Sequence, residues 1–307
     1  MRIAIMGAGA LGCYFGGRLA LAGNDVHFIA RGAHLDAMKT NGLQVKSPLG
    51  DFTIEKPQVH GDPATVGPVD YVLFLVKLFD TEAAAHQIGP LLGEETAVIS
   101  FQNGIDPWER IGAIIGMERV IGGAALIPAE IVEPGVIHHN AGFAKLVFGE
   151  FHHEFTERVT RFKDVLDAAR VSAEATDAID VQLWEKFIML SAFSATTSLM
   201  RSSIGPVMAN PLARSFFQNA LQESFTVGKA ECPAIKDDYV AQCMAFMDKA
   251  APSMRSSMSG DLERGKRLEV NDLSGAVVRI AEKHGIDTPT HRVTVQALSL
   301  YADGSPS

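Results

Sequence analysis

The chain of 307 residues contains only three cysteines, Cys13, Cys232 and Cys243. They are scattered, no two form a CxxC pair, and their number is odd. This usage argues against a disulfide framework and favours a protein of the reducing cytoplasm. Cys13 falls on an expected helix, where a small core side chain is a better interpretation than a nucleophile.

Long hydrophobic runs and an excess of positive charge are also absent. No apolar run reaches the roughly 18 residues of a membrane span, so we expect no membrane partner. The first apolar run is short and passes directly into a glycine-rich loop, which argues against a signal peptide. Lys and Arg number 27 against 36 Asp and Glu, and the net charge of −9 argues against nucleic-acid binding.

Ten histidines are present, but no HxxxH or HExxH motif occurs among them. Two adjacent pairs stand out, His138-His139 and His152-His153. Neighbours in sequence point apart on a strand and do not share a face of a helix. We therefore expect surface histidines and no metal site.

The N-terminus carries the strongest motif of the chain. An apolar run at 2–6 predicts a buried strand, and GAGALG follows at 7–12, before an amphipathic stretch. Gly7 allows a tight turn, Gly9 lets a pyrophosphate approach the backbone, and Gly12 lets helix and strand pack closely. The positive end of the helix dipole then faces the anion. The sequence predicts a dinucleotide site, with a turn that binds nothing as the alternative; its residues are Gly7, Ala8, Gly9, Ala10, Leu11 and Gly12.

The end of the second expected strand, at 25–30, indicates which dinucleotide binds. An NAD site usually places Asp or Glu about 20 residues beyond the glycines, whereas this strand ends at Arg31. A guanidinium suits a 2′-phosphate, which a carboxylate would repel. We therefore predict NADP(H), with Lys77 after the strand at 71–76 as a second cation. Ordinary surface roles are the alternatives for both side chains.

The fold class that the patterns predict is α/β, a Rossmann-type doubly wound sheet followed by an all-helical C-terminal domain. We expect an NADP-binding domain at 1–176 and a helical substrate domain at 177–307. A hairpin is expected over 43–54, and Gly285 to Thr290 predicts the end of one helix and the start of another. Strands are expected at 2–6, 25–30, 71–76, 97–101, 119–125, 130–138 and 144–149, the last two closing the sheet; helices are expected at 10–22, 32–40, 80–92, 106–115, 155–170, 178–200, 211–230, 236–249, 266–284 and 290–301.

Four polar side chains suit a substrate site beside a bound dinucleotide. Asn103 follows an apolar strand, so it lies at the carboxyl edge of the sheet. Lys186 lies on a long expected helix among apolar residues, Ser257 lies in a serine-rich stretch, and Glu269 lies just inside the next expected helix. The structural alternatives are a turn for Asn103, a solvated lysine, a helix cap for Ser257 and a surface partner for Glu269.

Taken together, these segments resemble the ketopantoate reductase (2-dehydropantoate 2-reductase) family. The matching pieces span almost the whole chain in the family's order: GAGALG, Arg31, Leu75-Val76-Lys77, Gln102-Asn103-Gly104, Glu130-Ile131 with Pro134-Gly135, Trp184-Glu185-Lys186, Ser256-Ser257-Met258 with Asp261, Glu269, and His284-Gly285-Ile286 with Thr288-Pro289.

The resemblance implies that NADPH reduces a 2-keto acid, with ketopantoate as the expected substrate and pantothenate synthesis as the expected pathway. It implies that Lys186 donates the proton to the developing alkoxide. It further implies that Asn103 helps to hold the nicotinamide and the lysine, that Glu269 binds a substrate hydroxyl, and that Ser257 contacts the substrate carboxylate.

Three positions depart from the family's pattern. Well-studied members often carry asparagine where this chain has Leu190 and Ser194, near the face of Lys186, and where it has Met254. Ser194 remains a candidate substrate contact, and a larger or less polar 2-keto acid is an alternative substrate.

Other classes of protein share the two-domain pattern. A dehydrogenase of the hydroxyacyl-CoA or 6-phosphogluconate type is one alternative, and a non-catalytic NADP-binding sensor is another. The expected partner is a small-molecule 2-keto acid, and a helical second domain is compatible with a homodimer.

Overall fold

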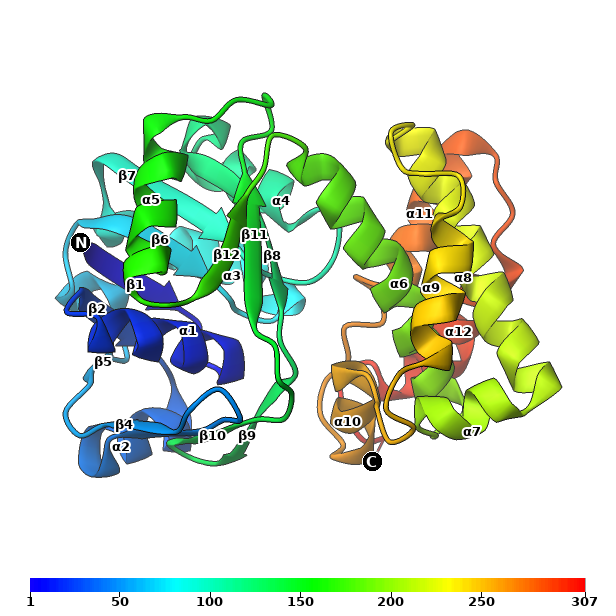
Figure 1. Ribbon diagram of the computed structural model, residues 1–307, viewed down its shortest axis with the longest axis horizontal. Coiled ribbons are helices and arrows are strands. Elements are labelled where there is room, and N and C mark those ends of the chain that lie inside the picture. The colour runs from blue at the N-terminus through cyan, green and yellow to red at the C-terminus, as the bar shows by residue number, and fades with distance from the viewer. Residues whose placement is uncertain (307) are drawn as a thin grey trace. The chain divides into compact units, whose positions relative to one another are not determined.

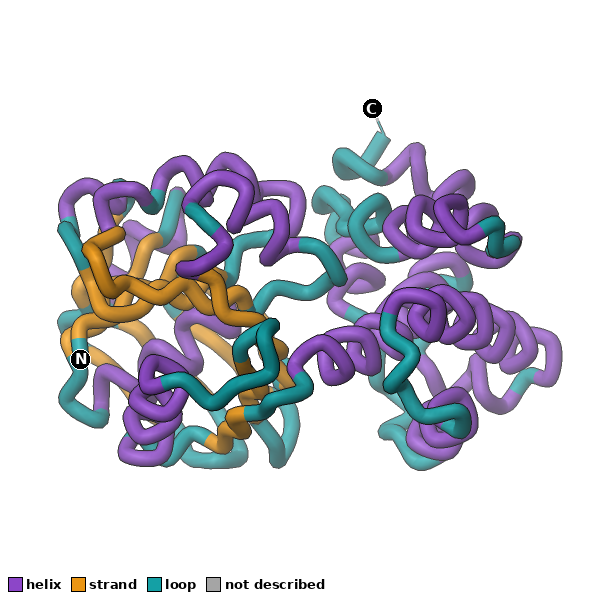
Figure 2. The backbone as a smooth tube through the Cα atoms, turned by 90° about the horizontal axis from the view of Figure 1, so that it is seen from above, coloured by secondary structure: helices purple, strands orange, loops and turns teal. Residues whose placement is uncertain are grey.

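The computed structural model describes residues 1–306, and the chain divides into two compact units, Met1–Ile179 (unit 1) and Asp180–Ser307 (unit 2). Strands occur in unit 1, whereas the described part of unit 2 consists of helices and loops (Figure 2). This arrangement confirms the predicted α/β class with a following helical domain. None of the helices in residues 1–306 combines the length and apolar character that crossing a bilayer requires.

The described strands of unit 1 form a large sheet of eight strands and a small sheet of four. The large sheet contains β1 (Arg2–Met6), β2 (Asp25–Ile29), β5 (Gln58–His60), β6 (Val69–Phe74), β7 (Leu92–Ser100), β8 (Val120–Leu126), β11 (Lys145–Gly149) and β12 (Ser172–Ala175). The helices of unit 1 are α1 (Ala10–Leu21), α2 (Gly32–Asn41), α3 (Thr81–Gln87), α4 (Pro107–Ile115) and α5 (Glu157–Ala168).

The strand order of the large sheet reverses beside β1. The order is β12-β11-β8-β7-β6-β1-β2-β5, and its pairs are parallel except for β11 with β8 (Figure 1). In the register, Ile3 lies opposite Val26 of β2, and Ile5 lies opposite Leu73 of β6. Open parallel sheets bind ligands at the carboxyl ends of the strands where the order reverses. The ends of β1 and β6 therefore form the edge where this fold class binds its ligands.

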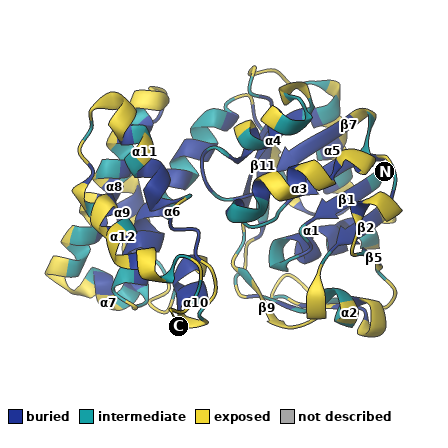
Figure 3. Cartoon of the chain, turned by 180° about the vertical axis from the view of Figure 1, so that it is seen from behind, coloured by how far each residue is buried: buried dark blue, intermediate teal, exposed yellow. Residues whose placement is uncertain are grey.

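The central strands of the large sheet are buried under the helices that pack on it, and β1, β2 and β7 appear mostly dark blue in Figure 3. Ile5, Leu73 and Ile99 are all 0% exposed. A strand buried on both faces needs a continuous apolar run, which is the signal that predicted these elements. The expected strands at 2–6, 25–30, 71–76, 97–101 and 119–125 are confirmed as β1, β2, β6, β7 and β8.

The small sheet has the order β4-β3-β10-β9, from β3 (Leu43–Lys46), β4 (Phe52–Ile54), β9 (Ala129–Glu133) and β10 (Val136–His139). β3 and β4 form the predicted hairpin. The prediction of one strand at 130–138 that closes the large sheet is wrong. This segment forms β9 and β10, turns at Gly135 with φ of 82°, and pairs with β3 instead. Segment 144–149 does join the large sheet, as β11.

Helix α1 packs between the two sheets. A Cβ added to Gly16 would lie 2.7 Å from the Phe28 ring of the large sheet. A Cβ added to Gly17 would lie 2.5 Å from the Phe52 ring of the small sheet. The close packing on both sides therefore requires these glycines, and it holds the helix that begins immediately after the GAGALG loop.

Burial tests two predictions about single side chains. His139 was expected at the surface, but it is 2% exposed, so that prediction is wrong. Its ring nitrogens lie 2.8 Å from Ser47 Oγ and 2.8 Å from Phe143 O, and these contacts satisfy the buried ring. Cys13 is 0% exposed within the hydrophobic core, which confirms its interpretation as a core residue.

Short elements account for most other differences in unit 1. The helix expected at 80–92 is wrong in length: α3 ends at Gln87, and Pro90 then lacks the N–H that a helix needs. β5 and β12 were not predicted. They are the two edge strands of the large sheet, so exposed side chains interrupt their apolar pattern.

The helices of unit 2 are α6 (Ile179–Leu199), α7 (Ile204–Ala209), α8 (Pro211–Glu231), α9 (Tyr239–Asp248), α10 (Ser257–Glu263), α11 (Ser274–His284) and α12 (Pro289–Leu298), of which α6 begins at the last residue of unit 1. α7 and α10 were not predicted, because one or two turns are too short to show a helical period. Gly285 adopts a left-handed φ of 65° after α11, and Pro289 opens α12, which confirms the predicted stop and restart.

The expected start of the helix at 266 is wrong. α11 begins at Ser274, so Glu269 lies before the helix and not inside it. Leu268, Glu269 and Val270 are 3%, 4% and 0% exposed. Three consecutive buried side chains do not fit one face of an amphipathic helix, and an irregular segment buries all of them.

Glu150 follows β11, and its side chain is 1% exposed. The carboxylate accepts hydrogen bonds from Arg158 Nε at 2.7 Å, Arg158 Nη2 at 2.7 Å and Thr156 Oγ1 at 2.6 Å. Burial alone would raise the pKa of Glu150, but Arg158 and Thr156 outweigh burial and hold that pKa below 4.5. The stability that results is complete above pH 4.5 and is lost as the pH falls through the lower folded-state pKa.

We expect Glu150→Ala to lower the free energy of unfolding by about 3 kcal/mol at pH 7, because it leaves the Arg158 charge unpaired. The matched control is Glu174→Ala, which breaks the exposed pair with Lys145 and should cost less than about 1 kcal/mol. Urea unfolding of both variants measures the difference, and equal losses would contradict this account.

Candidate functional site

The GAGALG loop joins the end of β1 to α1 and lies against the end of β6. Gly7 has φ of 93°, and a Cβ added there would lie 2.7 Å from Val76 N. A Cβ added to Gly12 would lie 2.7 Å from Gly7 O and from the Ile5 side chain. Both glycines are therefore required by the close approach of backbone to backbone and of helix to strand.

Gly9 is different, because a Cβ added there meets no described atom within 4 Å. The hydrogen-bond ladder of α1 begins with Cys13 N–H on Gly9 O at 2.8 Å, so the N–H groups of Ala10, Leu11 and Gly12 precede it. The first turn of α1 carries no acidic side chain. Open space beside N–H groups at the positive end of a helix fits the pyrophosphate of a dinucleotide.

Gln102 connects the ends of two neighbouring strands. Its side-chain amide nitrogen donates to Val76 O at 3.0 Å and to Thr81 Oγ1 at 2.9 Å, and its oxygen accepts from Ser100 Oγ at 3.1 Å. These bonds hold the segment after β6 against the segment after β7. Asn103 follows directly and is partly exposed, at the carboxyl edge where it was predicted.

Arg31 follows β2, and its side chain is 83% exposed. Its Nη2 donates to Asp80 Oδ2 at 2.5 Å, from the 3-10 helix Leu78–Asp80 after β6. Lys77 directly precedes that helix. The two predicted cations therefore lie on neighbouring segments beyond β2 and β6, and a carboxylate that the sequence reasoning did not consider lies with them.

Lys186 of α6 has a buried side-chain nitrogen, although other parts of the residue are partly exposed. Its Nζ has no hydrogen-bond partner within residues 1–306. Burial lowers the pKa of Lys186 from 10.5 to about 8, although the negative charge of Glu269 acts in the opposite direction. The interpretation of Lys186 as an ordinary solvated lysine is therefore wrong.

Glu269 is a further predicted site residue of unit 2. The residue is 4% exposed, and its carboxylate is near enough to raise the pKa of Lys186. Its carbonyl oxygen accepts from Asp272 N at 3.1 Å and from Leu273 N at 2.9 Å, which joins it to the segment that starts α11. Unit 2 thus brings a buried amine and a buried carboxylate together from positions 83 residues apart (269 − 186).

The positions that depart from the family's pattern differ in their surroundings. Ser194 is 0% exposed, and among the described residues its hydroxyl finds no hydrogen-bond partner. Leu190 lies between Lys186 and Ser194 at helical spacing and is partly exposed, as is Met254. An unpaired buried hydroxyl costs free energy unless a ligand or water satisfies it, and the hydroxyl of Ser198 on the same helix is in the same state.

Ser257 is exposed and begins α10. The cap of α10 is its neighbour Ser256, whose Oγ accepts from Ser259 N at 3.1 Å. The alternative that Ser257 caps the helix is therefore wrong. Ser256 Oγ also lies 2.8 Å from Thr197 Oγ1, which holds the start of α10 against the C-terminal half of α6.

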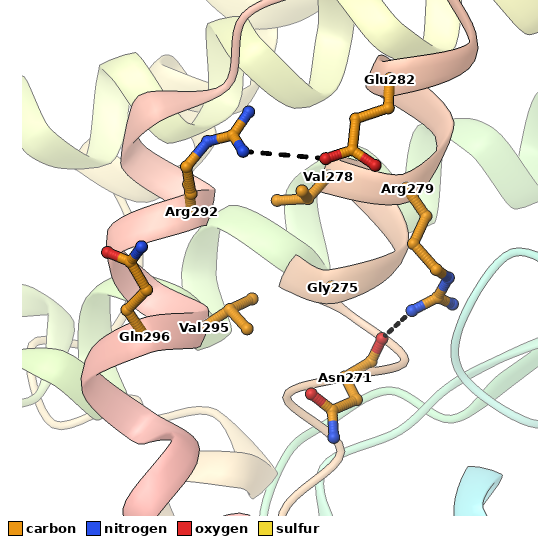
Figure 4. Close-up of a pocket in the computed structure, with 8 residues that line it drawn as sticks. All are labelled: Asn271, Gly275, Val278, Arg279, Glu282, Arg292, Val295 and Gln296. Carbon is orange, nitrogen blue, oxygen red and sulfur yellow. Dashed lines mark hydrogen bonds and ion pairs between the residues drawn. The ribbon is translucent and has the colours of Figure 1, made fainter.

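A separate pocket of about 310 Å³ lies between α11 and α12. Figure 4 shows Arg292 paired with Glu282 at 3.7 Å and Arg279 donating to Asn271 O at 2.7 Å. None of the predicted site residues lines this pocket, so it is not the candidate site.

The fold and the loop define a class, the proteins with a dinucleotide-binding sheet followed by a helical unit. Within that class, the description "Ketopantoate reductase PanE/ApbA" matches residues 3–153, and its C-terminal counterpart matches residues 178–302. The chain belongs to the ketopantoate reductase family. It is an oxidoreductase of CH–OH groups, from a family of keto acid reductases that use a nicotinamide cofactor.

Relatives cover nearly the whole chain. The 2-dehydropantoate 2-reductase of Archaeoglobus fulgidus is 31% identical over 99% of this chain and 98% of its own. A crystal structure of 2-dehydropantoate 2-reductase from Geobacter metallireducens has a TM-score of 0.91 at 31% identity and covers 97% of this chain and 99% of its own. A D-mandelate dehydrogenase solved with NADH and anilino(oxo)acetate has a TM-score of 0.89 at 22% identity over 98% of both chains, which shows the fold alone.

Two substitutions distinguish Gly7, which the packing requires, from Gly9, which we expect to face the dinucleotide. We expect Gly9→Ala to fold with an unchanged melting temperature but to bind the nicotinamide dinucleotide at least ~10-fold more weakly, because the methyl group occupies the space beside the N–H groups. Gly7→Ala should instead lower the stability, because the added Cβ meets the Val76 backbone.

The matched control is Gly89→Ala, where the added Cβ also meets nothing within 4 Å. Fluorescence titration with reduced dinucleotide measures the affinity. Binding by Gly9→Ala as tight as that of Gly89→Ala would contradict this role for the loop.

Proposed function

We propose that this protein reduces a 2-keto acid with NADPH, and that ketopantoate, which gives pantoate for pantothenate synthesis, is the first candidate substrate. The observation that carries the proposal is the buried Lys186 ammonium beside the buried Glu269 carboxylate. In this proposal residues 1–176 bind the cofactor, and residues 177–307 supply the acid and the substrate contacts.

The cofactor would be held at the carboxyl edge of the large sheet. The N–H groups at the start of α1 would bind the pyrophosphate, with Gly7 and Ala8 forming the turn, and Asn103 would lie near the nicotinamide. The reduced nicotinamide supplies the hydride that the keto carbon receives. Arg31 and Lys77 would bind the 2′-phosphate.

Lys186 has the chemistry that the oxygen of the substrate requires. As the keto carbon gains a hydride, its oxygen becomes negative, and an ammonium stabilises that charge and then transfers a proton to it. A pKa of about 8 leaves Lys186 mostly protonated at neutral pH while making it a better acid than an ordinary lysine. Glu269 keeps the ammonium charged and would also bind a substrate hydroxyl, Ser257 would contact the carboxylate, and Ser194 would supply a further hydroxyl.

We expect Lys186→Ala to lower kcat by about 10²- to 10⁴-fold while dinucleotide affinity stays unchanged. For the parent enzyme, kcat should fall as pH rises through about 8, because the protonated amine is the active form. Steady-state kinetics across pH 6–10 measure both. Lys229→Ala, which removes a partly buried lysine paired with the exposed Asp237, is the control and should keep full activity. Undiminished turnover by Lys186→Ala would remove the proposed acid. A parent protein that binds the dinucleotide but turns over no 2-keto acid would instead favour a non-catalytic sensor.

Arg31 tests the choice of cofactor. Its exposed pair with Asp80 is worth about 1 kcal/mol or less, so a dianionic 2′-phosphate can compete for the guanidinium. Arg31→Ala should raise the KM for NADPH by about 10-fold or more and leave the KM for NADH nearly unchanged. Asp80→Asn should strengthen NADPH binding. A parent enzyme that prefers NADH would contradict the assignment.

The substrate itself is tested by a panel of 2-keto acids with NADPH oxidation followed optically. Efficient, saturable turnover of ketopantoate supports the first candidate. The apolar Leu190 and Met254 favour a second candidate, a larger or less polar 2-keto acid. Turnover of such an acid without turnover of ketopantoate would keep the reaction and replace the substrate.

A further inference from the structure

A buried histidine lies at the centre of unit 2, outside the residues given a role above. His291 of α12 is 0% exposed. Its Nε2 lies 3.0 Å from Ala220 O and 2.8 Å from Ser224 Oγ, both on α8, and its Nδ1 lies 3.1 Å from Ser274 Oγ of α11. Ser224 Oγ in turn lies 2.9 Å from Ser191 Oγ of α6. One side chain thus links four helices.

The carbonyl groups at the ends of this network fix the direction of each hydrogen bond. Ala220 O can only accept, so Nε2 carries a proton, and in the neutral ring Nδ1 accepts from Ser274 Oγ. At the other end Ser191 Oγ donates to Ile188 O at 3.2 Å, so Ser191 accepts from Ser224. Ser191 and Ser224 then each donate and accept, Ser274 donates to Nδ1, and the Nε2 proton is shared between Ala220 O and Ser224 Oγ.

The charges around His291 are consistent with a neutral ring. Burial lowers the pKa of His291, and Glu223 of α8 opposes that shift. The Glu223 carboxylate is held by Thr290 N at 2.9 Å and His291 N at 3.0 Å, at the start of α12. On α11 the ring meets the Ser274 hydroxyl, while Arg292 and Glu282 pair with each other at the pocket of Figure 4.

Both ends of the network lead to the proposed acid and its carboxylate. Ser191 lies on α6, five residues after Lys186 (191 − 186). Ser274 is the first residue of α11. Glu269 O accepts from N–H of Leu273, the residue that precedes this helix, and Val270 O accepts from Gly275 N–H in its first turn, each at 2.9 Å. Displacing α11 from α6 therefore changes the separation of the amine and the carboxylate.

We propose that His291 is a positioning residue for the reaction: by bonding α8, α11 and, through Ser224, α6, it fixes the distance between Lys186 Nζ and the Glu269 carboxylate. This inference rests on the proposed function, since it gives His291 a part only if Lys186 is the acid. The attraction between two charges falls with distance, so breaking the hydrogen bonds of His291 weakens the stabilisation of the Lys186 ammonium by the Glu269 carboxylate. Without that support the buried amine loses its proton at lower pH.

The test compares variants that break one arm of the network each. Ser274→Ala removes the bond between α12 and α11, and Ser191→Ala removes the bond to α6. His291→Leu removes every bond of the ring, and His291→Asn keeps an acceptor near the place of Nδ1. We expect Ser274→Ala and His291→Leu to lower kcat by about 10-fold with KM changed less than ~3-fold.

The decisive reading is the pH profile of kcat. The basic limb of this profile is the range in which kcat falls as the pH rises. In Ser274→Ala and His291→Leu, this limb should move to lower pH by about 0.5 unit or more, and His291→Asn should restore part of the shift. The control is Thr294→Val, one turn further along α12, which removes a buried hydroxyl bonded only to Thr290 O in the described structure. It should lower the melting temperature without moving the limb.

Nitrogen-15 NMR of the imidazole gives a second reading that does not depend on activity. We expect a neutral ring protonated at Nε2 at pH 7. A ring protonated at Nδ1, or a limb that moves equally in Thr294→Val and Ser274→Ala, would overturn the proposal. An unmoved limb in Ser274→Ala and His291→Leu, with Lys186→Ala inactive, refutes the role of His291 alone, whereas an active Lys186→Ala refutes the proposed function itself.

Discussion

The burial of one amine next to one carboxylate is the interaction on which the site depends. Lys186 Nζ is removed from water and finds no hydrogen-bond partner among residues 1–306. Burying an amine in this way costs folding free energy. Glu269 reduces the cost of the buried charge without removing it. In our account, the oxygen of the substrate is the hydrogen-bond partner that Lys186 Nζ lacks in the protein without ligands. The unpaired hydroxyl of Ser194 lies on the same helix.

In our proposal, backbone groups at the edge of the large sheet bind the anionic part of the cofactor. Gly7 and Gly12 bring α1 against β1 and β6, and Gly9 leaves room beside the helix N-terminus. Gln102 then holds the ends of β6 and β7 together. These parts of the edge are held by close packing and buried hydrogen bonds, whereas Arg31 is an exposed side chain that can exchange partners.

The sequence predicted those features that leave a periodic or spaced pattern. The five apolar strands confirmed in the large sheet, the long helix at 178–200, the turn at GAGALG and the break at Gly285 have such patterns, and the structure contains each of these elements. β5 and β12 lack the pattern because they are exposed edges, and β9 and β10 were misplaced because strand pairing depends on distant residues. Of the site, Lys186 could be singled out from its apolar neighbours. Asp80 and His291 could not, because their roles arise from contacts between segments far apart in sequence.

The most direct test of the central claim is the titration of Lys186 itself in the protein without ligands. Proteins with carbon-13 at lysine Cε would be titrated by NMR, using Lys186→Arg to assign the signal and Glu269→Gln to remove the carboxylate. The account predicts a midpoint near 8 in the parent and a lower one in Glu269→Gln. A midpoint near 10.5 that does not respond to Glu269→Gln would contradict it.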